Sequence, residues 1–342
     1  MPAMTGSAVT ATAPTRIDLA GGTLDIWPLS MLVPGALTLN VAIDLAARVT
    51  VRPRRDGKVR IVSRDRRRQV TRRAPLALDD VRGPLALLQR LVAAFEPRGG
   101  LDLISEASAP AGAGLGGSSA LGIAAAAALA RFTGQRLGSA RMLQRVMNLE
   151  AIELNVPTGS QDYLAALHGG LGAYHHGPDG IRHERVQPPA GFAERVVLAY
   201  TGQPRDSGFS NWEMFRRFVD GERVTVERMR AIARIAAELL DALRAGDLDA
   251  CGKLIGEEGR LRYRLAPSVS TPLLRAAGAA ARRAGALGVK VCGAGGGGCM
   301  VAIAAAGRGG AVARAISASG ARVLDVGIAA RGVRVRTAAR SR

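Results

Sequence analysis

The segment APAGAGLGGSSALG, from Ala109 to Gly122, is rich in glycine and leads directly into an alanine-rich stretch. Glycine lets backbone N–H groups approach an anion closely, and a following helix adds unpaired donors and the positive end of its dipole. The hydroxyl groups of Ser118 and Ser119 could bind a phosphate oxygen or a Mg²⁺ ion. No Gly-Lys-Ser/Thr ends the loop, which excludes the Walker type. We predict a phosphate-binding loop, with a tight structural turn as the alternative.

A second glycine loop, GAGGGG, runs from Gly293 to Gly298 between two apolar segments. A hairpin needs only one or two glycines for positive φ angles, whereas this loop has five in six residues. The excess indicates that the backbone passes close to another group. A flexible loop tip is the alternative interpretation.

Two acidic residues between these loops could take part in phosphoryl transfer. Glu150 lies in a predicted helix, and Asp162, twelve residues later, lies in the first turn of the next one. A solvated helix face and a favourable position in the helix dipole are the structural alternatives. Beside a phosphate-binding loop, one carboxylate could hold Mg²⁺, and the other could orient or deprotonate an acceptor hydroxyl.

The elements that must position these groups begin with an antiparallel β region over residues 7–62. Its predicted short strands are AVTATAP, TRIDLAGG, ALTLNVAIDL, ARVTVRP and KVRIVSR. Helices are predicted for 84–95, 118–132 and 139–155, the last with Ser139 as a good N-cap. A second β patch, GLGAYHHG to GIRHERV, closes the first domain. A linker is predicted near residue 190.

The second half starts with the predicted strand RVVLAYTG, followed by the polar loop QPRDSGFSN. Helical stretches are predicted for residues 212–244, 247–261 and 271–284. The strands GVKVCGA and CMVAIAAA flank the second glycine loop, and the β-like segments ARVLDVGI and GVRVRT end the chain. Helix and strand therefore alternate in an α+β manner.

The charge is strongly basic, because 47 Lys and Arg against 28 Asp and Glu give a formal net charge of +19 over 342 residues. Residues 48–73 supply +10 of it, and their alternation predicts a hairpin with solvent-facing arginines. Codon bias explains the arginine excess as well as function does. An RNA-binding module is a remote alternative, because the 48–73 run contains no aromatic residue for base stacking. We expect no nucleic-acid partner, and whether the hairpin has another partner stays open.

The cysteines and the apolar runs of the sequence indicate where in the cell the protein is located. Cys251, Cys292 and Cys299 have no CxxC or CxxH spacing, so neither a disulfide framework nor a zinc site is predicted. The first residues do not resemble a signal peptide, and the most apolar run, ALGIAAAAALA, is too short to span a membrane. We expect a cytoplasmic protein without a membrane partner. The sequence leaves open whether it forms a homodimer.

Three motifs, in this order, resemble the GHMP kinase superfamily, which includes galactokinase, homoserine kinase and mevalonate kinase. They are PTRIDLAGGTLDI from Pro14 to Ile26, PAGAGLGGSSAL from Pro110 to Leu121, and KVCGAGGGGCM from Lys290 to Met300. The resemblance covers nearly the whole chain. It implies a two-domain α+β architecture, with a ribosomal-protein-like ATP-binding domain over 1–190, a ferredoxin-like C-terminal domain over 191–342, and the active site in the cleft between them.

Within the superfamily, TRIDLAGG, GSQDYLAALHGGLGAYHH and AYTGQPRDSG are most similar to bacterial heptose-phosphate kinases and other sugar 1-kinases. This resemblance implies that Asp162 is the base or orienting group for a sugar hydroxyl. Arg16 then stabilises the reacting hydroxyl and the transferring phosphoryl group, and Asp25 binds substrate hydroxyls. Ser119 and Glu150 match the Mg²⁺ ligands.

The resemblance also implies a nucleotide-binding set and further substrate contacts. The nucleotide-binding residues are Pro110, Gly112, Gly114, Leu115, Gly116, Gly117, Ser118, Ser119 and Ala120. The further substrate-binding residues are Thr23, Gly295 and Gly296.

Two departures concern the acceptor. Residues 21–25 are GGTLD, where heptose kinases have Gly-Gly-Gly-Thr-Asp and galactokinases have Gly-Glu-His-Thr-Asp. Arg16 replaces the Lys typical of mevalonate kinases, which weighs against an isoprenoid acceptor. The expected function is therefore transfer of the γ-phosphoryl group of ATP, with Mg²⁺, to a hydroxyl of a sugar or sugar phosphate. A kinase or decarboxylase acting on an isoprenoid or amino alcohol, such as mevalonate or homoserine, is the alternative.

Overall fold

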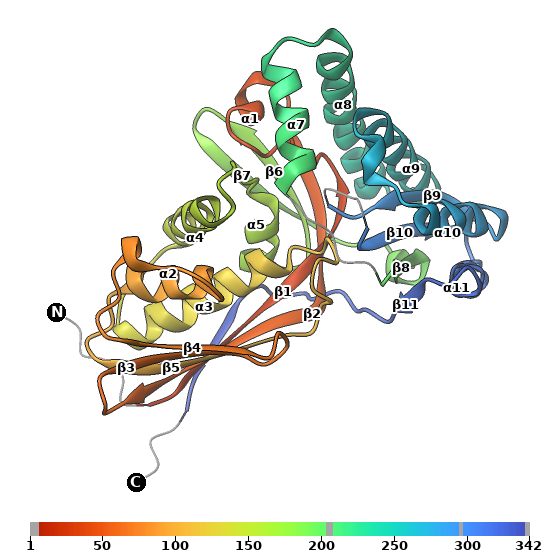
Figure 1. Ribbon diagram of the computed structural model, residues 1–342. Helices are drawn as coiled ribbons and strands as arrows, with labels where there is room; N and C mark the ends of the chain where they lie inside the picture. Colours follow the sequence, from red (N-terminus) through yellow and green to blue (C-terminus); the bar gives the residue numbers. More distant parts are fainter. Residues whose placement is uncertain (1–6, 203–207, 294–296, 339–342) are drawn as a thin grey trace.

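The computed structural model describes residues 7–202, 208–293 and 297–338. Its larger sheet has eight strands in the order β12-β1-β2-β5-β3-β4, with β6 paired to β2 and β7 paired to β6. Figure 1 shows this sheet in the lower half of the molecule and along its centre. Its strands are β1 (Val9–Ala20), β2 (Leu37–Arg54), β3 (Lys58–Ser63), β4 (Arg68–Arg73), β5 (Gly100–Ala107), β6 (Leu171–Gly177), β7 (Gly180–Val186) and β12 (Arg334–Thr337).

The first two strands are longer than the sequence predicts. Four predicted short strands merge into β1 and β2, which pair in an antiparallel manner along almost the whole of β1. The register shifts between Pro14 and Thr15 and again between Asp18 and Ala20. A β-bulge tolerates proline within a strand, so Pro14 bends β1 without ending it.

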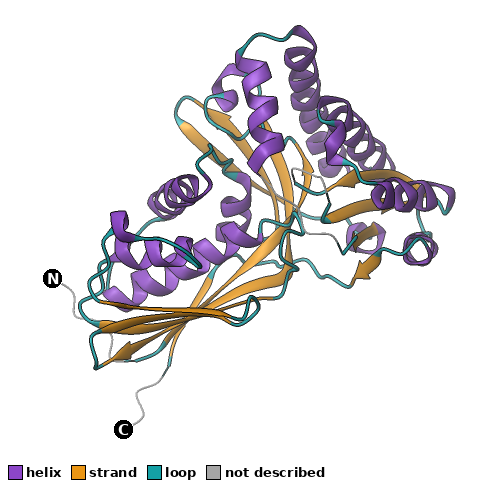
Figure 2. Cartoon of the chain, viewed as in Figure 1, coloured by secondary structure: helices purple, strands orange, loops and turns teal. Residues whose placement is uncertain are grey.

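Four helices lie on the first sheet: α2 (Ala86–Phe95), α3 (Gly117–Thr133), α4 (Ser139–Leu154) and α5 (Gln161–His168). Figure 2 shows them on one side of the strands. The alanines of α3 are buried, and their small side chains let the helix approach β1 and β2 closely. All four elements were predicted in outline. The predicted N-cap was wrong, because Gly138 takes that position and Ser139 is the first helical residue.

The second sheet has the order β11-β8-β10-β9 and is antiparallel throughout. Its strands are β8 (Val196–Tyr200), β9 (Ala286–Val291), β10 (Cys299–Ala304) and β11 (Arg322–Leu324). Numbered in chain order, they follow the arrangement 4-1-3-2, with helices between the first and second and between the third and fourth strands. This βαββαβ topology confirms the predicted ferredoxin-like unit.

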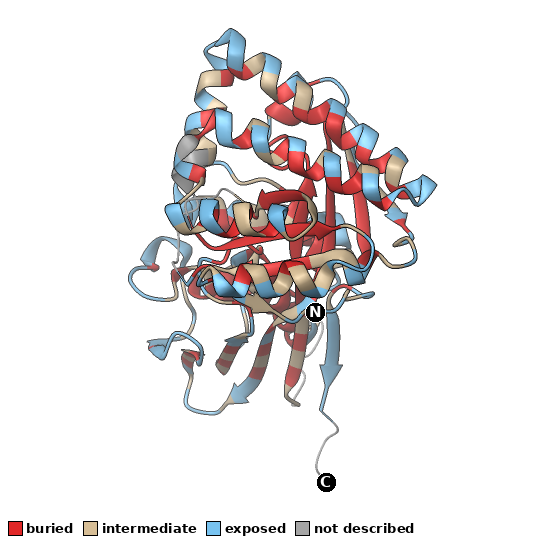
Figure 3. Cartoon of the chain, turned by 90° about the vertical axis from the view of Figure 1, so that its right-hand side faces the viewer, coloured by how far each residue is buried: buried red, intermediate tan, exposed pale blue. Residues whose placement is uncertain are grey.

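Helices cover both faces of the second sheet. Alternate residues of β8 face opposite sides, so Leu198 packs in the cluster containing α9, whereas Val197 and Ala199 pack against α10 and α11. Helix α7 (Gly208–Val219) packs against α8 (Arg223–Ala245) and not on this sheet. The other helices of this half are α6 (Phe192–Arg195), α8, α9 (Leu248–Leu265), α10 (Pro272–Arg283) and α11 (Gly309–Ala318). In Figure 3 they carry buried residues toward the sheet and exposed residues outward.

One apolar cluster joins the two sheets. It combines Ile17 and Leu39 of the first sheet with Leu239 of α8, Ile255 of α9 and Val301 of β10. Helices α8 and α9 therefore lie between the sheets and fix β1 relative to the ferredoxin-like unit. The fold is the expected two-domain α+β architecture.

Three predictions for the second half were incomplete. The predicted helix over residues 212–244 is interrupted at Gly221, whose φ of 76° lies in the left-handed region. Helix α11 was not predicted. The two last β segments enter different sheets, because β11 pairs with β8 and β12 pairs with β1. The domain boundary at residue 190 stays a prediction. Strand β12 lies after this boundary in the chain but pairs with β1 of the first sheet.

None of the described helices combines the length and the apolar character that a membrane crossing requires. The short elements that complete the described chain are α1 (Leu29–Leu32) and two 3₁₀ turns, η1 (Leu78–Asp80) and η2 (Pro267–Val269).

Candidate active site

A cavity of about 360 Å³ brings together most of the predicted site residues. It lies where the first glycine loop, the second half of β1 and the connection between α4 and α5 meet. The predicted residues that line it are Arg16, Thr23, Asp25, Pro110, Gly112, Gly114, Leu115, Gly116, Gly117, Ser118, Ser119, Glu150 and Asp162. Gly295 and Gly296 lie outside the described residues.

The first glycine loop has a backbone that only glycine adopts readily. Gly112, Gly114 and Gly116 have φ angles of 68°, 78° and 70°, and α3 begins directly afterwards. The start of α3 thus opens into the cavity with its unpaired N–H groups. Ala120 does not line the cavity: it is fully buried and its N–H donates to the carbonyl oxygen of Gly116 at 2.9 Å. The structure therefore does not place Ala120 at the cavity, although the resemblance implied that it is one of the nucleotide-binding residues.

The second glycine loop lies against the first one. The N–H of Cys299 donates to the carbonyl oxygen of Ala113 at 2.7 Å, and a Cβ on Gly298 would lie 2.6 Å from that oxygen. Gly298 also has a φ of 76°. The predicted close approach of backbone is thus found at the described end of the loop, where the neighbouring group is the first loop itself.

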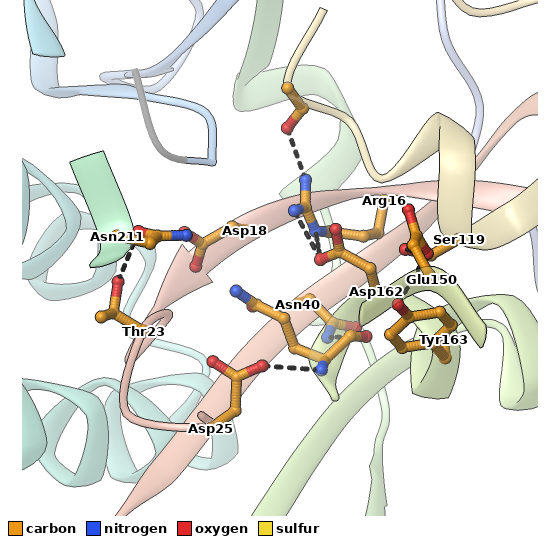
Figure 4. Close-up of polar contacts among 12 residues, drawn as sticks. Arg16, Asp18, Thr23, Asp25, Asn40, Ser119, Glu150, Asp162, Tyr163 and Asn211 are labelled. Atoms are coloured by element: carbon orange, nitrogen blue, oxygen red, sulfur yellow. Dashed lines mark hydrogen bonds and ion pairs between the residues drawn. The ribbon is translucent and has the colours of Figure 1, made fainter. Parts of the chain in front are cut away.

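Arg16 of β1 connects the first loop to α5. Its Nη2 lies 2.5 Å from Oδ1 of Asp162, and its Nε donates to the same oxygen at 2.8 Å. Its Nη1 donates to the carbonyl oxygen of Gly114 at 2.6 Å. Figure 4 draws these contacts. The Arg16 side chain is 3% exposed and that of Asp162 is 25% exposed, so the carboxylate is oriented by a buried cation yet open to the cavity.

Glu150 of α4 lies on the other side of the loop. Its Oε2 accepts hydrogen bonds from Tyr163 Oη at 2.6 Å and from Ser119 Oγ at 3.2 Å. Burial raises the pKa of the Glu150 carboxyl, and the hydroxyl groups of Ser118, Tyr163 and Ser119 oppose this shift. Among the described residues no group of three or more His, Cys, Asp or Glu forms a metal cage. One carboxylate and one hydroxyl fit Mg²⁺ that is shared with nucleotide phosphates, because proteins seldom cage this ion fully.

Asp25 and Thr23 mark the opposite end of the cavity. Asp25 Oδ2 accepts the backbone N–H of Gln161 at 2.9 Å, and burial raises the pKa of its carboxyl to about 6. Thr23 has a φ of 70°, and its hydroxyl donates to Oδ1 of Asn211 at 3.1 Å. The strained turn over residues 21–25 thus points both side chains into the cavity (Figure 4).

Sequence reasoning missed a buried ionic cluster beneath this end. Lys290 Nζ lies 3.0 Å from Asp18 Oδ1 and 3.1 Å from Glu258 Oε2. Arg262 Nε donates to Glu258 Oε1 at 2.7 Å, and its Nη1 donates to Thr23 Oγ1 at 3.3 Å. Two signals were available, because Asp18 follows Arg16 by two residues on a strand and Arg262 follows Glu258 by four on a helix.

The basic hairpin over residues 48–73, for which the sequence predicted only solvent-facing arginines, also contributes to the cavity. Asp65 and Arg66, in the turn between β3 and β4, line the cavity beyond the first loop. Part of the hairpin charge is neutralised, because Arg54 and Arg60 both form ion pairs with Asp102 of β5, at 2.9 and 2.8 Å. Of this hairpin, only the turn between β3 and β4 lines the cavity.

Comparison with known proteins places this architecture in a family. Residues 84–170 match the family described as "GHMP kinases N terminal domain", and residues 239–322 match "GHMP kinases C terminal". Together these ranges cover half of the chain. The first range contains the first glycine loop, Glu150 and Asp162, and the second contains Glu258, Arg262 and Lys290.

Individual relatives agree. D-glycero-alpha-D-manno-heptose 7-phosphate kinase of Campylobacter jejuni is 27% identical over 297 residues, 84% of this chain and 86% of that one. Mevalonate kinase of Methanothermobacter thermautotrophicus is 30% identical over 233 residues, 64% and 70% of the two chains. The solved structure of Lactococcus lactis galactokinase complexed with galactose has a TM-score of 0.77 at 19% identity, covering 96% and 95%. The chain therefore belongs to the GHMP kinases and is an ATP-dependent kinase that phosphorylates a hydroxyl group.

Proposed function

We propose that this kinase transfers the γ-phosphoryl group of ATP to a hydroxyl of a sugar or sugar phosphate. The observation that carries the proposal is the position of Asp162. Its carboxylate is open to the cavity, is held by Arg16, and lies beside the backbone of Gly116, where a Cβ would be 3.1 Å away. An acceptor hydroxyl bound at Asp162 is therefore next to the phosphate-binding loop.

Each residue then has a physical role. The N–H groups at the start of α3 and the left-handed glycines bind phosphate oxygens. Asp162 orients the acceptor hydroxyl and receives its proton, and Arg16 stabilises the charge that develops between hydroxyl and phosphoryl group. Because Arg16 also binds Gly114, the acid and the loop are held at a fixed separation. Positioning and fixed charge are the main contributions of a protein to phosphoryl transfer.

Ser119 and Glu150 are the residues that would hold Mg²⁺. The ion would neutralise phosphate charge as the phosphoryl group moves. Ser119 Oγ and Glu150 Oε2 are 3.2 Å apart, close enough to serve one ion together. Tyr163, whose hydroxyl donates to Glu150, fixes the rotamer of this carboxylate.

A polyol acceptor is supported by the two acids that line the cavity at its opposite ends. Asp25 and Asp162 both accept hydrogen bonds, and sugar hydroxyls are donors that match them. The named relatives include a heptose 7-phosphate kinase and a galactokinase. Mevalonate is the second candidate acceptor, because several similar proteins are mevalonate kinases, among them the one that is 30% identical.

An ADP-release assay tests this proposal. The wild-type protein is offered ATP and Mg²⁺ with galactose, mannose, heptose 7-phosphate, mevalonate or homoserine, and carbon dioxide is measured in parallel. We expect acceptor-dependent ADP release with at least one sugar or sugar phosphate and no carbon dioxide. ADP release with mevalonate or homoserine only, or release of carbon dioxide, would replace the sugar assignment.

A further inference from the structure

Three polar side chains converge above the backbone of Gly22. A Cβ at this position would lie 2.6 Å from Gln161 Nε2, 2.7 Å from Arg262 Nη2 and 2.9 Å from Asp18 Oδ2. The three side chains come from α5, α9 and β1, and all line the cavity. Because Gly22 has no side chain, the donors Gln161 Nε2 and Arg262 Nη2 and the acceptor Asp18 Oδ2 can approach the same point.

These groups are buried but incompletely hydrogen-bonded. Gln161 is 7% exposed and Arg262 is 4% exposed, yet Gln161 Oε1 and Arg262 Nη2 have no hydrogen-bond partner. Arg262 Nη2 lies 3.9 Å from Asp18 Oδ2, which is beyond hydrogen-bond distance. Buried polar groups normally have partners, and leaving one unpaired costs free energy. Gln89 shows the usual case, since its amide donates to two backbone carbonyls.

The cations around this point already face carboxylates, and Asp25 adds a further acid. Lys290 and Arg262 face Asp18 and Glu258, and Arg16 faces Asp162. Among the described residues that line this end of the cavity, no cation is left over for an anionic group. The remaining groups match neutral hydroxyl groups, because Arg262 Nη2 and Gln161 Nε2 can donate to a hydroxyl oxygen and Gln161 Oε1 can accept a hydroxyl hydrogen.

We propose that Gln161 and Arg262 form the acceptor-specificity pair of this enzyme, and that they bind uncharged hydroxyl oxygens of the acceptor. The inference rests on the proposed sugar-kinase function. A second part of the proposal is that a phosphate or carboxylate group on the acceptor binds away from Gln161 and Arg262. Asp18 completes the set as the acceptor of a hydroxyl hydrogen.

Kinetics of Gln161→Met, with the best sugar from the ADP-release panel as the probe, test the assignment. We expect the KM for that sugar to rise about tenfold, the loss of one hydrogen bond, while the KM for ATP stays unchanged. Tm should not fall, because the replaced amide oxygen has no partner in the protein. The matched control is Gln89→Met, which should lower Tm and leave both KM values unchanged.

Arg262→Lys is the second variant, because it keeps a positive charge beside Glu258 while removing Nη2. It should raise the sugar KM about tenfold or more and spare the KM for ATP. Unchanged sugar KM values in both variants overturn this inference alone, as does an equal rise in Gln89→Met. If the wild-type enzyme phosphorylates no sugar, the proposed function fails and this inference fails with it.

Discussion

Arg16 and Asp162 are 146 positions apart in the sequence, yet Arg16 Nη2 lies 2.5 Å from Asp162 Oδ1. The pair joins β1 to the first turn of α5, and the same guanidinium binds the carbonyl of Gly114 in the phosphate-binding loop. One buried arginine therefore sets the distance between the proposed acid–base group and the glycine loop that we propose binds the nucleotide phosphates.

Replacing Asp162 by Asn should abolish turnover. The amide cannot accept the hydroxyl proton and loses its ion pair with Arg16, so we expect kcat to fall by about 100-fold or more. Nucleotide affinity, measured by calorimetry, should change little, because the loop glycines remain. Asp241→Asn is the matched control, since Asp241 is 76% exposed on α8. A decrease of less than about tenfold in kcat would show that Asp162 is not the acid–base group.

Asp25 should make stability depend on pH. Its pKa is about 6 in the folded protein against an ordinary 3.8, so the folded state holds the proton more tightly. The contribution of the Asp25 carboxyl to the free energy of unfolding is therefore full below about pH 4, and it is lost as the pH rises through about 6. Asp25→Asn should therefore be more stable than wild type at pH 7.5, by up to about 3 kcal/mol, and should lose this advantage near pH 4.

Thermal unfolding of both proteins between pH 4 and 7.5 measures this difference. The amide oxygen can still accept the N–H of Gln161, so the hydrogen bond is preserved in the variant. If Asp25→Asn were less stable than wild type at pH 7.5, the proposed burial cost would be contradicted. Activity of the variant should be low at every pH, because the proposed contact of Asp25 with the substrate is lost.

Gly116→Ala should impair activity beyond its effect on stability. The position has a φ of 70°, which costs about 1 kcal/mol for alanine, and the added Cβ would press on the Asp162 side chain 3.1 Å away. Gly57→Ala is a matched control, because Gly57 has a φ of 66° and open space around its Cβ position. Both variants should unfold at lower temperature. Loss of kcat in both, or in neither, would contradict the close contact between loop and acid.

Arg66→Ala should weaken nucleotide binding modestly. Arg66 is exposed and lines the cavity beyond the phosphate-binding loop, so it could attract the anionic nucleotide. We expect the KM for ATP to rise about fivefold at low salt, with a smaller effect at high salt. Arg68→Ala, in β4 and not among the cavity residues, should have no effect. Equal changes of the KM for ATP in the two variants would show that the net positive charge of the protein, and not the position of Arg66, affects nucleotide binding.

The sequence predicted the parts of the site that depend on local pattern. The glycine loop before α3 shows as composition, and Glu150 and Asp162 show as acids in consecutive helices. The order of helices and strands predicted only an α+β alternation, and the ferredoxin-like unit was predicted from the resemblance to the GHMP kinases. These features depend on neighbours in the chain.

The rest depends on packing between distant elements. The spacings Arg16/Asp18 and Glu258/Arg262 place each pair on one face of its element, but they do not indicate that Asp18, Glu258, Arg262 and Lys290 meet, which happens because α9 packs between the two sheets. The strand through Pro14 was underestimated because a bulge, which proline tolerates, leaves no pattern of its own. The hairpin turn reaches the site because β3 pairs in parallel with β5.

Transfer of labelled phosphate from [γ-³²P]ATP to sugar, by wild type and by Asp162→Asn side by side, tests the central claim most directly. The account predicts a labelled sugar or sugar phosphate with the wild-type enzyme and none with the variant, although both bind ATP. Label on mevalonate alone, or equal labelling by both proteins, would contradict it.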